Sequence, residues 1–200
     1  MDNERLQSAV RMAVESLSAA NPKFPVVKKP IKISIANAQE TLTGIAQTIV
    51  PTFVWEESYG IIAGWLNDNE GRGIILAGPC GTGKSLMASV VCVALNIGLR
   101  KMPIMVTAAQ MNRRCEELLE EKCGGIIYID DIGRESESVV YGNRTVAFAD
   151  IVDGVERNSG LLIASTNLSP DELTRKYGER TIDRLRSITI TANLTGASHR

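Results

Sequence analysis

The chain has 200 residues, of which 44% are hydrophobic and 22% charged, and its formal net charge is −1. This balance is typical of a soluble globular protein with one core domain and an appendage. It excludes a global positive field for nucleic acid, and no apolar run reaches the length of a membrane span. The four cysteines lack Cys-x-x-Cys spacing, which argues against a zinc site or a disulfide framework. Because the first residues also lack the order of a signal peptide, we expect a cytoplasmic protein that does not enter a membrane.

Residues 1–20 are predicted to form an amphipathic helix, because Leu6, Val10, Ala13 and Leu17 recur at helical spacing. A helix this short must dock on its own domain or on a partner. Residues 21–50 are interpreted as a linker and a helical lead-in. Three prolines and three lysines between positions 21 and 30 indicate an extended, solvated segment. A DNA-binding arm is the alternative for this basic window.

The lead-in contains two further signals. Alternating Ile31, Ile33 and Ile35 predict a short strand or an extended contact. Asn37 and Glu40 then resemble a capping box for a helix that Pro51 stops. Another helix is predicted over 56–68, with an aromatic stripe that includes Trp55 and Tyr59. Core packing is the first interpretation of this stripe, and adenine stacking by one of these two rings is the alternative.

From residue 73 the chain alternates apolar strands with helices. This order predicts an α/β fold with a five-stranded parallel sheet and helices on both faces, in a nucleotide-binding core that spans 51–200. The predicted strands cover 73–78, 102–107, 125–130, 160–166 and 187–193. The predicted helices cover 84–96, 108–122, 143–157 and 170–186.

The strongest motif is a P-loop between the first of these strands and its helix, Gly78-Pro79-Cys80-Gly81-Thr82-Gly83-Lys84-Ser85. Its glycines let backbone N–H groups converge on a phosphate, and the following helix adds its positive dipole end. We expect Lys84 to reach the β- and γ-phosphates of ATP and Ser85 to ligate Mg²⁺.

Polar residues follow two later strands. Asp130 and Asp131 end an apolar strand, where α/β sheets bind their ligands. Asp130 fits a Mg²⁺ ligand, and Asp131 stands where many ATPases orient the attacking water; a helix cap is the alternative for the pair. Asn167 ends the next strand and could bond that water or the γ-phosphate, although Ser-Thr-Asn also forms turns.

Arg180 and Arg184 lie four residues apart and therefore share a helix face. A salt-bridged surface helix is one interpretation. An arginine finger that reaches the nucleotide of a neighbouring subunit is the other.

Together these motifs resemble the AAA+ ATPases of the DnaC/IstB type, the helicase loaders and transposition helpers. The resemblance runs from about Trp55 to Arg200. Besides the P-loop it is carried by Tyr-Ile-Asp-Asp-Ile-Gly-Arg-Glu at 128–135, Tyr-Gly-Asn at 141–143, Ser-Thr-Asn-Leu-Ser at 165–169, Tyr-Gly-Glu-Arg-Thr-Ile-Asp-Arg-Leu at 177–185 and Gly-Ala-Ser-His-Arg at 196–200.

The resemblance implies an AAA+ core without a separate helical lid. It implies that Asn167 is the sensor 1 residue, Arg184 the arginine finger and Arg200 a second arginine near the nucleotide. It further implies self-association through the nucleotide site, binding of single-stranded DNA and a replicative hexameric helicase as partner. In relatives a helix between Thr107 and Gly124 touches DNA; here that segment is short and offers Gln110, Asn112, Arg113 and Arg114.

The first functional hypothesis is therefore an ATPase that acts as a helicase loader or a related replication accessory factor, slow as a monomer and stimulated by assembly or DNA. An IstB-like transposition helper is the alternative within the family. A P-loop small-molecule kinase and a non-hydrolysing, ATP-switched assembly module are alternatives from other classes.

Overall fold

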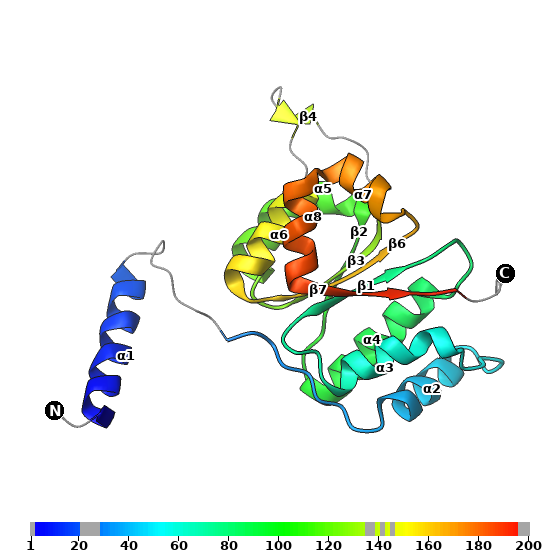
Figure 1. Ribbon diagram of the computed structural model, residues 1–200, viewed down its shortest axis with the longest axis horizontal. Coiled ribbons are helices and arrows are strands. Elements are labelled where there is room, and N and C mark those ends of the chain that lie inside the picture. The colour runs from blue at the N-terminus through cyan, green and yellow to red at the C-terminus, as the bar shows by residue number, and fades with distance from the viewer. Residues whose placement is uncertain (1–2, 21–28, 135–138, 141–142, 145–146, 196–200) are drawn as a thin grey trace.

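The computed structural model describes residues 3–20, 29–134, 139–140, 143–144 and 147–195 (Figure 1). Its centre is a five-stranded sheet in the order β2-β3-β6-β1-β7, and all neighbouring strands are parallel. This confirms the predicted fold class. The strands are β1 (Gly73–Ala77), β2 (Ile104–Thr107), β3 (Ile126–Ile132), β6 (Leu161–Thr166) and β7 (Thr189–Asn193).

Helices cover both faces of the sheet, as predicted (Figure 1). One core lies under α2 (Ala38–Ile49), α3 (Gly60–Asn67) and α4 (Lys84–Leu99), and it takes Ile74 and Leu76 of β1. The other core takes Ile75, because successive strand residues point to opposite faces. It lies under α5 (Ala108–Glu117), α6 (Ala147–Asn158), α7 (Pro170–Tyr177) and α8 (Glu179–Ile188).

The predicted helices after residue 107 differ in part from those of the structure. The helix predicted over 170–186 is divided into α7 and α8 at Gly178, whose φ of 82° is outside the helical range. The helix predicted from residue 143 begins at Ala147, after the short antiparallel strands β4 (Val139–Val140) and β5 (Asn143–Arg144). The helix predicted over 108–122 has the expected extent, but its last turn, Leu118–Lys122, is π-helical.

The lead-in packs against the core as an extended contact, not as a strand. Ile33 is buried, and its backbone N–H donates to the side-chain carbonyl of Asn69 at 2.8 Å. The predicted capping box at Asn37 is wrong, because this residue has a left-handed φ of 52° and makes no side-chain cap bond. The 56–68 helix is a 3₁₀ turn (Glu57–Tyr59) followed by α3.

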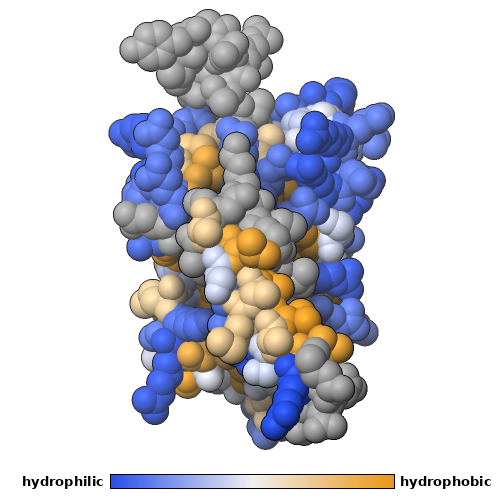
Figure 2. All heavy atoms as spheres, turned by 90° about the vertical axis from the view of Figure 1, so that its left-hand side faces the viewer, coloured by the Kyte–Doolittle hydropathy of each residue, from blue (hydrophilic) through white to orange (hydrophobic). Residues whose placement is uncertain are grey.

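Helix α1 (Asn3–Ala20) forms over the predicted residues and lies apart from the sheet in Figure 1. Its apolar residues Leu6, Val10, Met12 and Leu17 are exposed. Figure 2, which views the molecule from this side, shows hydrophobic side chains gathered along the middle of the face. Within the described ranges, no helix combines the length and the apolar character needed to cross a membrane.

Close approach of β1 and β6 leaves no room for a side chain at Gly73. A Cβ atom there would lie 1.9 Å from the backbone oxygen of Leu162. We expect Gly73→Ala to destabilise the fold by about 3 kcal/mol or more, because backbone atoms in a central sheet cannot move aside. Urea unfolding measures this change. Gly64→Ala is the matched control: nothing lies within 4 Å of its Cβ position, and alanine favours the helix. Equal stability of the two variants would contradict the prediction.

Candidate nucleotide site

The P-loop connects β1 to α4 at the carboxyl end of the sheet. Gly78 has no space for a side chain, because a Cβ atom would lie 2.3 Å from the backbone oxygen of Leu194. Gly83 caps α4 with a left-handed φ of 78°, which glycine adopts without strain. The sequence therefore folds here into a tight loop that directs the amino end of α4 into the site.

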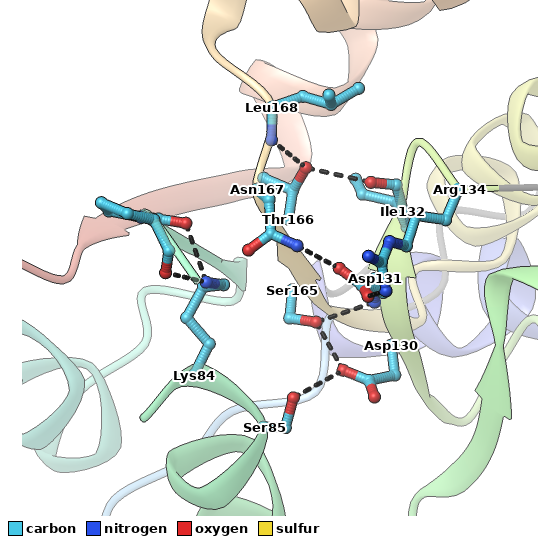
Figure 3. Close-up of polar contacts among 12 residues, drawn as sticks. Lys84, Ser85, Asp130, Asp131, Ile132, Arg134, Ser165, Thr166, Asn167 and Leu168 are labelled. Atoms are coloured by element: carbon cyan, nitrogen blue, oxygen red, sulfur yellow. Dashed lines mark hydrogen bonds and ion pairs between the residues drawn. The ribbon is translucent and has the colours of Figure 1, made fainter. Parts of the chain in front are cut away.

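Lys84 is the first residue of α4, and only 7% of its surface is exposed. Its ammonium donates to the backbone oxygens of Gly78 at 2.7 Å and Pro79 at 2.6 Å (Figure 3). A buried cation needs such acceptors. The contacts hold the charge inside the loop where a phosphate chain would bind.

Asp130 and Ser85 are brought together, as the predicted Mg²⁺ site requires. The Ser85 hydroxyl donates to Oδ1 of Asp130 at 3.2 Å (Figure 3). Ser165 and Tyr128 donate to the same oxygen, each at 2.6 Å. Burial, together with the hydrogen bond to Asp130, raises the pKa of Tyr128 well above its usual value, so the phenol stays protonated. Tyr128 was missed from the sequence because its position in an apolar strand suggested only packing.

Asp131 lies at an irregularity of β3, where the register with β6 shifts between Ile129 and Ile132. Its φ of 63° is left-handed, a conformation that aspartate tolerates better than most residues. Oδ1 accepts a hydrogen bond from the Asn167 amide at 2.6 Å, and Oδ2 pairs with Arg134 at 2.9 Å (Figure 3). Asp131 and Asn167, each predicted to act on the attacking water, are thus in contact, and Arg134 is an additional partner of Asp131.

Several of these groups line one cavity of about 560 Å³. Asp130 is not among the lining residues, but it accepts a hydrogen bond from Ser85, which is one of them. The polar part of the cavity includes Lys84, Ser85, Asp131, Arg134 and Asn167. Its other part is formed by residues that precede Gly78, the first P-loop residue, by 19 to 28 positions: Val50, Thr52, Phe53, Val54 and Tyr59. The size and the mixed lining suit a nucleotide-sized ligand.

The aromatic end of the cavity is built by packing. The rings of Phe53 and Tyr59 are stacked with centroids 5.9 Å apart, and Trp55 meets Tyr59 edge-on at 5.7 Å. Tyr59 is buried and lines the cavity, whereas Trp55 is not among the lining residues. Phe53 and Val54 were missed because no motif surrounds them.

Of the two candidate arginines, Arg184 is within the described residues. Arg184 on α8 forms ion pairs with Asp153 and Glu156 of α6, the second at 3.6 Å. The hydrogen bond to Asp153 raises the pKa of Arg184 further above its usual value. Arg184 does not line the cavity of its own chain, so its role as a finger remains a prediction about a neighbouring copy. Arg200 lies outside the described residues.

The residues considered for DNA are on α5. Gln110 completes a capping box with Thr107, and Arg114 pairs with Glu117 at 2.8 Å. Arg113 is exposed. The assignment of this helix to DNA stays a prediction.

The chain resembles several solved structures. It superposes on the DnaC helicase loader with a TM-score of 0.52, at 16% identity over 81% of this chain and 93% of that one. Superposition on a putative primosome component from Streptococcus pyogenes serotype M3 gives a TM-score of 0.51, at 17% identity over 84% of this chain and 86% of that one. Superposition on AMPPCP-bound DnaA from Aquifex aeolicus gives a TM-score of 0.50, at 16% identity over 72% of this chain and 49% of that one. At these identities the likeness establishes the fold alone. No curated protein matched the sequence.

The sequence itself identifies the family. Residues 74–189 match the model of the ATPase family associated with various cellular activities (AAA). The match covers more than half of the chain and runs from β1, just before the P-loop, to the first residue of β7. It contains Lys84, Asp131 and Asn167, which line the cavity, and Asp130, which accepts a hydrogen bond from the cavity-lining Ser85. The chain therefore belongs to the AAA family of ATPases.

Proposed function

We propose that this protein binds ATP with Mg²⁺, hydrolyses the ATP, and acts as a loader of a replicative helicase or as a related replication accessory factor. One observation supports the enzymatic part above all. A buried lysine, a serine that donates a hydrogen bond to Asp130, and an aspartate–asparagine pair line a single cavity.

Binding begins with the P-loop. Backbone N–H groups at the start of α4 and the Lys84 ammonium face the place of the phosphates. The Ser85 hydroxyl and the Asp130 carboxylate are 3.2 Å apart and are hard oxygen donors, which suits Mg²⁺. When bound, this ion neutralises charge on the phosphate oxygens.

Hydrolysis requires a water molecule in line with the γ-phosphate. The Asp131 carboxylate can accept a hydrogen bond from this water, and Asn167 holds the carboxylate by its amide at 2.6 Å. A carboxylate has about four acceptor sites, so the two bonds observed leave room for the water. The irregular backbone of β3 at Asp131 places this residue among those that line the cavity.

The loader role rests on the sequence motifs and on the structural likeness to a DnaC helicase loader. We propose a replicative hexameric helicase and single-stranded DNA as partners, and self-association through the nucleotide site. ATP hydrolysis by the purified full chain, measured alone and with single-stranded DNA, duplex DNA or a candidate hexameric helicase, tests this. Stimulation by both supports a loader; stimulation by duplex DNA alone indicates the IstB-like helper function.

A second candidate is an assembly module that binds ATP without hydrolysing it. The observation in its favour is that both carboxylate oxygens of Asp131 already have partners, one of them the cation of Arg134. This candidate requires ATP-dependent self-association and no phosphate release under any condition of the assay.

The finger assignment has its own test. We expect Arg184→Ala to leave ATP binding unchanged and to remove stimulation of hydrolysis by assembly, because the arginine acts on a neighbouring nucleotide. Where a finger acts, its loss costs about 10³–10⁵ in rate. Phosphate release measured against protein concentration shows the effect. Arg175→Ala, an exposed arginine on α7 outside the cavity, is the control. Retained stimulation in Arg184→Ala would remove the assignment.

A further inference from the structure

Arg134 is placed to interact with the nucleotide, although the sequence motifs assign it no role. Of the cavity-lining residues that the structure describes, Lys84 and Arg134 are the cations. Lys84 lies on the P-loop side, and Arg134 lies across the cavity, beyond the end of β3 (Figure 3). Its side chain is 72% exposed and reaches back to Asp131, whose side chain is 29% exposed.

The observed contact of Arg134 is weak and replaceable. A single ion pair of 2.9 Å at a solvent-accessible rim contributes little, because water screens both charges. A terminal phosphate carries more charge and three acceptor oxygens, and the planar guanidinium fork matches its geometry better than a point charge does. A γ-phosphate in the cavity therefore competes with the Asp131 carboxylate for this arginine.

The local backbone allows the exchange without loss of the site. The N–H of Arg134 donates to the backbone oxygen of Asp131 at 3.2 Å, which closes a turn. Lys176 of α7 donates to the backbone oxygen of Gly133 at 2.6 Å and anchors this turn. Asp131 itself keeps its backbone bond to Ser165 and its amide bond to Asn167 when the guanidinium moves away.

We propose that Arg134 senses the γ-phosphate: it leaves the Asp131 carboxylate for the terminal phosphate of a bound nucleoside triphosphate, and so distinguishes ATP from ADP. The same movement frees Oδ2 of Asp131 for the attacking water. The inference rests on the proposed ATP-binding function and names the residue that reads the third phosphate.

The first test is equilibrium binding to the full chain with Mg²⁺, using ADP and the non-hydrolysable analogue AMPPCP. We expect Arg134→Ala to weaken AMPPCP binding by about 10- to 100-fold, the range for a charge-assisted contact, and ADP binding less than twofold. Arg134→Lys should recover part of the lost AMPPCP affinity. Arg175→Ala, the control, should keep the wild-type ratio of AMPPCP affinity to ADP affinity. Equal weakening of both nucleotides, or of neither, would overturn the proposal.

A double-mutant cycle with Asp131→Asn tests the exchange itself. Neutralising Asp131 removes the competitor, so AMPPCP affinity should rise more when Arg134 is present than in the Arg134→Ala background. Additive effects would show that the two residues do not compete, and the proposal would fail. Failure of the wild-type chain to bind either nucleotide is a different result, since it would reject the proposed ATP function together with this one.

Discussion

Replacement of Lys84 by alanine is expected to weaken ATP binding by about 100-fold and to abolish hydrolysis. Only 7% of the Lys84 surface is exposed, and its ammonium donates to two backbone oxygens of the P-loop. Charge-assisted hydrogen bonds contribute about 1.5–3 kcal/mol each, and more than one would form with β- and γ-phosphates. Fluorescent-nucleotide titration measures the affinity, and phosphate release measures the rate.

Loss of binding must be separated from loss of fold. Lys84 also bonds the oxygens of Gly78 and Pro79, so its removal leaves two loop carbonyls without this donor. We expect a small decrease in Tm and an unchanged circular dichroism spectrum. Lys101→Ala, an exposed lysine before β2, is the matched control and should bind ATP normally. Wild-type affinity in the Lys84→Ala protein would contradict the nucleotide site described above.

Replacement of Asp130 by alanine is expected to affect both catalysis and stability. The carboxylate is the proposed Mg²⁺ ligand, and a bound metal ion stabilises transition-state charge by several kcal/mol. Without this ligand, hydrolysis should fall by about 100-fold or more. Oδ1 also accepts from Tyr128 and Ser165, which are 3% and 1% exposed. Leaving these donors unsatisfied should lower the free energy of unfolding by about 1–3 kcal/mol.

A second substitution separates the two effects. In the Asp130→Ala background, Tyr128→Phe removes a donor that has lost its acceptor, so part of the stability should return while hydrolysis stays low. Urea unfolding and phosphate release at several Mg²⁺ concentrations give the two readouts. Asp183→Ala, an exposed carboxylate on α8, is the control. If Asp130→Ala hydrolysed ATP with the wild-type Mg²⁺ dependence, Asp130 would not be a ligand of the ion.

The strands and the P-loop could be predicted because their signals are local. Strands β1 and β6 are short apolar runs closed by polar or turn residues, and the P-loop glycines stand at positions where the backbone must turn or approach another chain segment closely. Gly178 is also a local signal, because a glycine within a predicted helix can mark the end of that helix. Its left-handed backbone divides the predicted 170–186 helix, which the charge and apolar pattern alone presented as continuous.

Contacts between distant segments could not be predicted in this way. The pairing of Arg184 with Asp153 depends on how α8 packs on α6, and the aromatic wall of the cavity depends on residues 50–59 packing beside the P-loop. Neither α8 nor residues 50–59 contain a sequence pattern that predicts which distant residues they contact. Packing of the two helices decides which carboxylates Arg184 pairs with.

By itself the sequence determined the alternation of strands and helices and the phosphate-binding loop. It also determined the order in which Asp130, Asp131 and Asn167 follow two strands. The carboxyl ends of parallel strands lie at one edge of the sheet, so the sequence predicts that these residues lie near one another. Only the tertiary structure decided which atoms meet there. The register shift that turns Asp131 toward Asn167, the three hydroxyls on Asp130 and the position of Arg134 across from Lys84 all arise from non-local packing.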